Sequence, residues 1–265
     1  MQNKYSQSVK IKNVRNAVID IAGGVSGGTL STAFYIGETY SLKELAATYK
    51  PFALSPIGKP PLYVSPPATV YDGRLGGWLG PWIMSKTNSA AVCRTYGLLG
   101  GIWGPAFSYG EYLNYRNRLF AEFMRFSLTF GSLMLKVPLV RWVLRKVLPA
   151  AGEGPTEEAL QNGKLYMRII AETDEPTPRM GSITVTADKD PAYFLTGICL
   201  IKFFLILAMM LVEAGLVLVR ELKETPVWSI FNEIERQSVV VTPALLGDHL
   251  RDRLESGGLH FTLEI

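Results

Sequence analysis

The residue types that most often carry catalysis are scarce in this sequence. Its only histidines are His249 and His260, and neither has a cysteine or acidic residue at a metal-ligand spacing. Its only cysteines, Cys93 and Cys199, lie far apart and form no Cys-x-x-Cys pair. This pattern indicates neither a zinc site nor a disulfide framework, so we expect no bound metal and a reducing compartment.

A glycine-rich segment at 23–28 lies where a phosphate-binding turn would lie, between an apolar run at 17–21 and an expected helix. Dinucleotide-binding turns need glycines at positions i, i+2 and i+5, and no register of these four glycines supplies that spacing. We interpret the segment as a tight strand-to-helix turn that needs small residues for close packing. Ser26 lies between glycines and is interpreted as structural.

Local patterns predict the elements that must position any site. In the first part of the chain they predict a polar arm at 1–16, a strand at 17–21, helices at 29–38 and 41–49, and an irregular surface excursion at 51–81. Ser41 and Glu44 have the spacing of a capping box. The arm lacks the apolar region of a secretory signal peptide, so we expect none.

The second part of the chain alternates between helix and strand patterns. They predict a helical stretch at 109–148 that is broken near Pro138, antiparallel strands at 165–171 and 182–187, a strand at 239–241, a helix at 243–255 and a last strand at 259–265. Within the first of these, residues 139–148 have an apolar side and a side with Arg141 and Arg145. This helix could lie flat in a membrane interface or dock its apolar side on a sheet.

Composition limits the classes of partner. The net charge of +4 and pI near 9.0 come from mostly scattered basic residues, which argues against nucleic acid as a partner. The hydrophobic fraction of 48% is more than a soluble domain needs, so we expect lipid, a partner or another domain to cover part of it. The apolar run at 193–219 is long enough for a membrane-spanning helix, with a buried core helix as the alternative.

Four blocks in a fixed order carry a family resemblance. They are Gly23–Thr29, Pro81–Tyr109, Gly152–Glu158 and the Thr-Pro-Ala-x-x-Gly-Asp sequence at Thr242–Asp248. Together they resemble the C-terminal two-thirds of the saccharopine-dehydrogenase-like oxidoreductases, in the branch of the trans-acting enoyl reductases. The resemblance covers about Val18 to Ile265 and implies one C-terminal domain at 17–265 with an apolar insertion near 194–207.

The resemblance also implies a fold and a chemistry. It implies an α+β fold with a mixed, mostly antiparallel sheet, packed helices and one long hydrophobic helix, and a substrate-binding and dimerisation domain that could form a homodimer. The implied reaction is the NADPH-dependent reduction of a conjugated double bond in a hydrophobic polyketide- or lipid-like substrate. Members of that family begin with a dinucleotide-binding domain that we do not find in this sequence, so NADP is expected from the resemblance alone.

Candidate catalytic residues come from the second block. Such a reduction needs a proton donor and a group that binds the carbonyl oxygen: Tyr109 could donate, Asn88 or Arg94 could bind the oxygen, and Glu111 is a further candidate. The alternative is that Tyr109 stacks with Tyr112 in a core while Arg94 pairs with a surface carboxylate.

A second function of a different class is also open. The chain could be a non-catalytic, dimerising or membrane-associated module that contacts lipid through 139–148 and 193–219. On either hypothesis we expect an intracellular, membrane-associated protein, and the sequence does not indicate the organelle.

Overall fold

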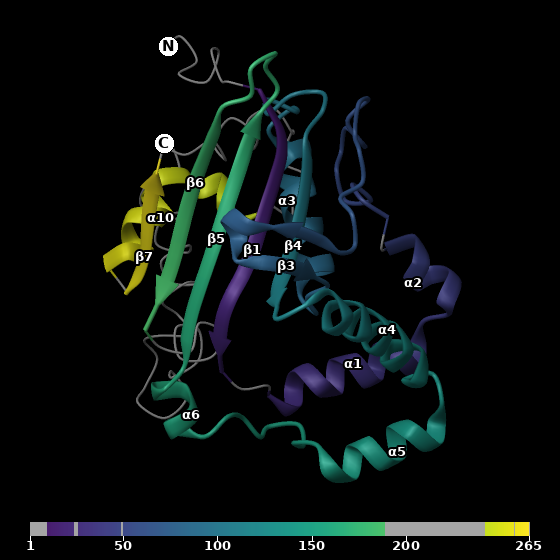
Figure 1. Ribbon diagram of the computed structural model, residues 1–265. Coiled ribbons are helices and arrows are strands. Elements are labelled where there is room, and N and C mark those ends of the chain that lie inside the picture. Colours follow the sequence, from purple (N-terminus) through teal and green to yellow (C-terminus); the bar gives the residue numbers. More distant parts are fainter. Residues whose placement is uncertain (1–9, 24–25, 49, 189–241, 257, 265) are drawn as a thin grey trace, which may run out of the picture.

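The fold is a mixed α+β arrangement built on one sheet (Figure 1). The computed structural model describes residues 10–23, 26–48, 50–188, 242–256 and 258–264. Over these residues the sheet has seven strands in the order β2-β3-β4-β1-β5-β6-β7. Their bounds are β1 Ile11–Ala22, β2 Val70–Asp72, β3 Gly77–Gly80, β4 Ser108–Tyr115, β5 Lys164–Thr173, β6 Met180–Ala187 and β7 Leu259–Glu264. Of the strand pairs, β1 and β4 run parallel and the others antiparallel, so the predicted fold class is confirmed in this respect.

The central strand β1 is longer than its sequence predicts. It begins at Ile11, so residues 11–16 belong to the sheet although they were expected in the polar arm. The reason is pairing on both edges: β4 pairs with residues 13–18 and β5 with residues 11–22. Backbone groups that bond to two neighbouring strands hold polar residues in a strand that a hydrophobic pattern does not reveal.

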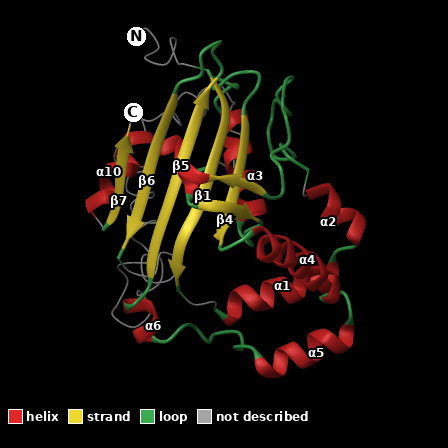
Figure 2. Ribbon diagram, viewed as in Figure 1, coloured by secondary structure: helices red, strands yellow, loops and turns green. Residues whose placement is uncertain are grey.

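One face of the sheet is covered by helices (Figure 2). Helix α3, Ser85–Leu98, packs on β4, and α10, Gly247–Ser256, packs on β7 after the short 3-10 turn η5, Pro243–Leu246. The predicted helix at 243–255 is therefore interrupted, because Gly247 has a φ of 62°. Thr95 of α3 and Thr242 bring the second and fourth sequence blocks together, since their hydroxyl oxygens lie 2.6 Å apart in the interior.

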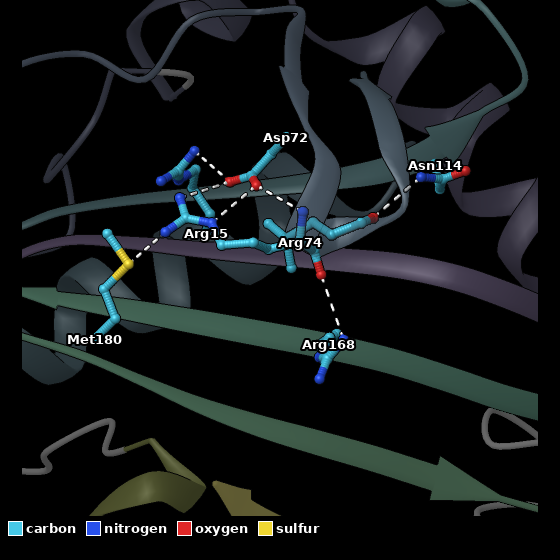
Figure 3. A network of polar contacts seen from close by, with 7 residues as sticks. Arg15, Asp72, Arg74, Asn114, Arg168 and Met180 are labelled. Carbon is cyan, nitrogen blue, oxygen red and sulfur yellow. Dashed lines mark hydrogen bonds and ion pairs between the residues drawn. The ribbon is translucent and has the colours of Figure 1, made fainter. Parts of the chain in front are cut away.

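The hairpin of β2 and β3 packs over the opposite face. Its Leu75 and Leu79 form a buried cluster with Ala17, Tyr112 and Ile170 from the strands below. Asp72, Arg74 and Arg15 form a charged group on the same side of the sheet (Figure 3). The Asp72 carboxylate accepts from Arg74, and an Arg15 guanidinium nitrogen lies 2.5 Å from Asp72 Oδ2. These ion pairs fasten the hairpin to β1.

Three helices lie beyond one end of the sheet, where α1, α4 and α5 form a group of their own (Figure 1). They span Gly27–Thr39, Arg118–Met134 and Pro138–Val147, with α2 at Leu42–Thr48 and α6 at Glu157–Gln161 nearby. The capping box is confirmed: the Ser41 N–H donates to Glu44 Oε2 at 2.7 Å and the Glu44 N–H to Ser41 Oγ at 3.3 Å. The break before Pro138 is confirmed as well, since α4 ends at Met134.

Two predictions about secondary structure are wrong. Residues 108–115 form β4 and not the start of a helix, because their pairing with β1 and β3 overrides a local pattern that also fits a helix. The Pro- and Gly-rich excursion contains β2, β3 and the 3-10 turn η1, Gly73–Leu75. Such short strands depend on their partner strands for their hydrogen bonds, which local propensity does not show.

The expected long hydrophobic helix at 193–219, the insertion near 194–207 and the strand at 239–241 lie outside the described residues. Among the residues that are described, no single helix is long and apolar enough to cross a membrane. One bent pair, α4 with α5, passes that test only when its two helices are taken together, and they meet at 106°.

Candidate active site

Four polar side chains form a hydrogen-bonded chain between β1, β4 and α3. The Asn88 amide nitrogen donates to Glu111 Oε1 at 2.7 Å, and the Tyr109 hydroxyl donates to Glu111 Oε2 at 2.9 Å. The Asn16 amide nitrogen donates to the Tyr109 oxygen at 3.1 Å. We call Asn16, Tyr109, Glu111 and Asn88 the tyrosine–glutamate chain.

The strand period places three of these residues on one face of the sheet. Tyr109 and Glu111 are two positions apart in β4, so their side chains point the same way, and Asn16 of β1 is the registered partner of Glu111. The fourth member of the group, Asn88, comes from α3, and this helix packs on β4. Two parallel strands and one covering helix therefore supply the whole group.

The direction of the hydrogen bonds follows from the groups themselves. A carboxylate only accepts, so both Asn88 and the Tyr109 hydroxyl donate to Glu111, and the Tyr109 oxygen then accepts from Asn16. The other amide atom of Asn16, Oδ1, is buried without a hydrogen-bond partner among the described residues. Buried polar atoms are usually satisfied, so this oxygen marks a place where a further donor fits.

Burial controls the acidity of Tyr109. Glu111 and Asn16 are about 5% and 4% exposed. Burial of its phenol raises the pKa of Tyr109 far above the ordinary value, and the nearby charge of Glu111 raises it further. The phenol therefore keeps its proton throughout the physiological range and donates a hydrogen bond to Glu111.

An apolar cluster encloses one side of the tyrosine–glutamate chain. Phe52, Cys93, Tyr96 and Phe107 are buried, and Tyr109 packs against them. The rings of Tyr96 and Phe107 stack with their centroids 5.2 Å apart. Burial also raises the pKa of Cys93 to about 11, so this thiol stays protonated and unreactive near neutral pH.

The structure brings together some of the predicted candidates and separates others. Asn88, Tyr109 and Glu111 form one group, whereas Arg94, also in α3, donates to the Leu54 carbonyl oxygen at 2.9 Å. Among the described residues the hydrogen bonds of the tyrosine–glutamate chain do not include Arg94.

Tyr109 and Tyr112 do not stack with each other. They lie an odd number of positions apart in β4, so they belong to the buried clusters on opposite faces of the sheet. Asn16 was missed by sequence reasoning because it precedes the apolar run at 17–21 and was assigned to the polar arm. The signal that could have found it is a polar residue one position before a buried strand segment.

The first turn of α1, which follows the glycine-rich segment, does not fit a pyrophosphate group. The Gly27 N–H donates to the Glu153 carbonyl oxygen at 2.8 Å, and a Cβ at Gly27 would lie 1.7 Å from the Ala150 carbonyl oxygen. Ser26 Oγ accepts the Thr29 N–H and caps α1. Backbone from the third sequence block therefore fills the place where a phosphate would lie, and Gly27 is needed for close packing. Among the residues that the structure describes, no cluster of potential metal ligands occurs.

Comparison with known proteins gives a distant relationship. The chain is 26% identical over 254 residues to "Putative trans-acting enoyl reductase Rv2449c" of Mycobacterium tuberculosis strain H37Rv, and equally to MT2525 of strain CDC 1551, which has the same description. The alignment covers 89% of this chain and 56% of each relative, so the chain spans about half the length of these relatives. No family model and no solved structure matches. The chain is thus a distant relative of proteins named as enoyl reductases.

Proposed function

We propose that this chain takes part in the NADPH-dependent reduction of a conjugated double bond in a hydrophobic, polyketide- or lipid-like substrate. This assigns it to the trans-acting enoyl reductases within the saccharopine-dehydrogenase-like oxidoreductases. The distant relatives support the reaction class. The observation that carries the proposal is the tyrosine–glutamate chain, because it places a protonated phenol beside a buried carboxyl group and an apolar cluster.

The chemistry assigned to this chain is the proton half of the reaction. Reduction adds hydride to one carbon of the double bond and a proton to the other. In our proposal the Tyr109 O–H bond breaks as the proton reaches the substrate carbon, the phenolate left behind takes a proton from water, and the Glu111 carboxylate holds the phenol in place. Asn16 and Asn88 hold the two groups in line by donating to Tyr109 and Glu111.

The hydride is the contribution of the nicotinamide cofactor, which we infer from the resemblance alone. The first turn of α1 does not fit its pyrophosphate, so no described residue is assigned to the cofactor. The surrounding apolar side chains suit a hydrophobic acyl group because they exclude water from the proton donor.

The test is an enoyl reductase assay on the purified chain. The probe is a trans-2-decenoyl N-acetylcysteamine thioester with NADPH, followed by cofactor absorbance and by deuterium incorporation from D2O. We expect Tyr109→Phe and Glu111→Gln to lower the rate at least about 100-fold, as loss of a general acid does. Tyr112→Phe is the matched control, because its buried hydroxyl donates to the Pro67 carbonyl oxygen on the other face of the sheet. The proposal fails if the chain neither binds NADPH nor reduces the thioester, or if Tyr109→Phe is as active as Tyr112→Phe.

The second candidate function is a non-catalytic module that dimerises or contacts a membrane. It is favoured by one observation, the exposed apolar side chains of α4 and α5. On this hypothesis the tyrosine–glutamate chain is only a core feature. Its Tyr109→Phe variant would then differ from wild type in stability alone.

A further inference from the structure

Helix α5 leaves most of its apolar side chains exposed. Arg141 and Arg145 both donate to Glu38 Oε1 of α1, at 3.2 and 2.8 Å, and Arg145 also lies over the Phe34 ring. The outward side carries Leu139, Trp142, Val143 and Val147, which are between 45% and 70% exposed, whereas Val140, Arg141 and Leu144 are less exposed. A helix docked on a sheet buries its apolar side, and no residue of α5 is buried, so that predicted arrangement is not seen among the described residues.

Helix α4 continues the same surface. Leu119, Phe123, Phe126, Phe130 and Leu133 follow one another at spacings of three and four, which puts them on one side of the helix, and each is between 43% and 82% exposed. The buried side of α4 is marked by Ala121, which meets Gly80 of β3. We call the outward residues of the two helices the α4–α5 apolar face.

The segment that carries this face is mostly basic. Residues 118–147 hold six basic side chains and one acidic one, whereas the rest of the chain holds 21 basic and 22 acidic. The net positive charge of the chain therefore comes from the segment that carries the apolar face. Lys146 lies 3.8 Å from the centroid of the Trp142 ring, where its stem can bury while its charge stays at a polar boundary.

We propose that the α4–α5 apolar face docks on an anionic lipid bilayer, with both helices lying in the interface plane. Outward apolar and aromatic side chains bordered by cations are what an interfacial helix needs. A second copy of the chain would bring two positively charged surfaces together, which disfavours it as the occupant. Each helix is too short to span a bilayer, and the 106° bend prevents the pair from crossing as one rod.

The test is flotation of the purified full chain with phosphatidylcholine vesicles, with or without about 30% phosphatidylglycerol. We expect binding to the anionic vesicles that weakens with salt. The double variant Phe126→Gln/Phe130→Gln should lower vesicle partitioning at least about tenfold. Both rings are more than 60% exposed, so the variant should keep the wild-type circular dichroism spectrum and melting temperature. The matched control is Leu62→Gln/Val64→Gln, which removes equally exposed apolar side chains from a loop.

Two charge-reversal variants distinguish binding of the α4–α5 apolar face to anionic lipid from binding to another occupant. Arg118→Glu/Lys146→Glu should abolish the preference for anionic vesicles, whereas Lys12→Glu/Lys59→Glu, with the same change in net charge elsewhere on the surface, should retain it. The proposal is overturned if the phenylalanine variant floats like wild type, which would assign any binding to other residues. It is also overturned if light scattering shows a dimer that the phenylalanine variant dissociates, or if the wild-type chain binds no vesicles.

Discussion

Asp72 and Glu111 are both acidic residues about 5% exposed, but they lie on different sides of the sheet and have different partners. Asp72 contacts two guanidinium groups, those of Arg15 and Arg74. Glu111 accepts hydrogen bonds from a phenol and an amide, which carry no charge. The charges of two cations stabilise the ionised form of a carboxylate, whereas neutral donors stabilise it less. The comparison indicates a structural role for Asp72, and the proposed function assigns Glu111 to the reaction.

The acidity of Asp72 agrees with a structural role. Burial by itself would raise the pKa of its carboxyl group, but hydrogen bonds from Arg74 and the charges of Arg15 and Arg74 outweigh burial and leave the pKa below its ordinary value. Figure 3 shows how Arg74 reaches further, donating to Met180 of β6 while its carbonyl oxygen accepts from Arg168. This network joins the β2–β3 hairpin to three strands of the sheet.

The largest expected effect is on the Asp72 side of the comparison. Asp72→Asn removes the carboxylate charge, so the largely buried cation Arg15 loses its ion pair. This loss should lower the free energy of unfolding by about 3 kcal/mol. Urea denaturation measures this change. The control is Asp252→Asn, whose ion pair with Arg251 is exposed and should contribute less than about 1 kcal/mol. Equal effects of the two substitutions would contradict the structural role.

Lowering the pH should reduce the contribution of the Asp72 ion pairs to the free energy of unfolding. The folded pKa of Asp72 is lowered, so its ion pairs stabilise the fold fully above the unfolded pKa, near 4, and are lost as pH falls through the folded pKa. The difference in unfolding free energy between wild type and Asp72→Asn should therefore be constant from pH 7 to about 5 and shrink below about pH 4. A difference that grows on acidification would contradict the lowered pKa.

Substitution of Glu111 should lower the free energy of unfolding less than substitution of Asp72, and it should lower the reductase rate more. Glu111→Gln keeps the size of the side chain but replaces one accepting oxygen with a donor, so one hydrogen bond of the chain is lost, at a cost of about 1–2 kcal/mol. Thermal and urea unfolding check this value beside the reductase assay. A loss as large as that of Asp72→Asn, without loss of activity in a chain that reduces the thioester, would make Glu111 structural too.

The smallest expected effect concerns the thiol beside Tyr109. Because burial raises the pKa of Cys93 to about 11, its thiolate fraction at pH 8 should be about one in a thousand. In a Cys199→Ser background, the native protein should react with Ellman's reagent far more slowly than the urea-unfolded protein. Fast reaction of the native protein would show that the apolar cluster is open to solvent.

Much of the fold could be predicted because the responsible interactions are local. The capping box of Ser41 and Glu44 starts a helix where the sequence says it should, and Pro138 ends one helix and begins another. The alternating residues of β5 and β6 predict a hairpin, and Gly27 predicts a close approach, here to Ala150. Each of these features depends on residues close together in the chain or on the missing side chain of one glycine.

The candidate site could be predicted only in part. Residues 108–115 carry Tyr109 and Glu111 at the spacing of a strand. The pattern around them also fits a helix, which is the element that was expected. Asn16 could not be connected to them, because their contact depends on β1 and β4 lying side by side across about 90 positions of chain. Arg94 has a residue type suited to binding an oxygen, yet its position on α3 directs it toward Leu54.

The sequence by itself determined several helix ends and the residue types available for proton transfer, since capping and side-chain chemistry act over short distances, and the family resemblance implied the fold class. Only the tertiary structure decided which polar residues meet, because register across β1 and β4 brings Asn16 to Tyr109 and Glu111. It also decided that Arg141 and Arg145 of α5 reach Glu38 while most of the apolar side chains of this helix stay exposed. An amphipathic pattern states that a helix has two sides, and the neighbouring charge determines which side faces inward.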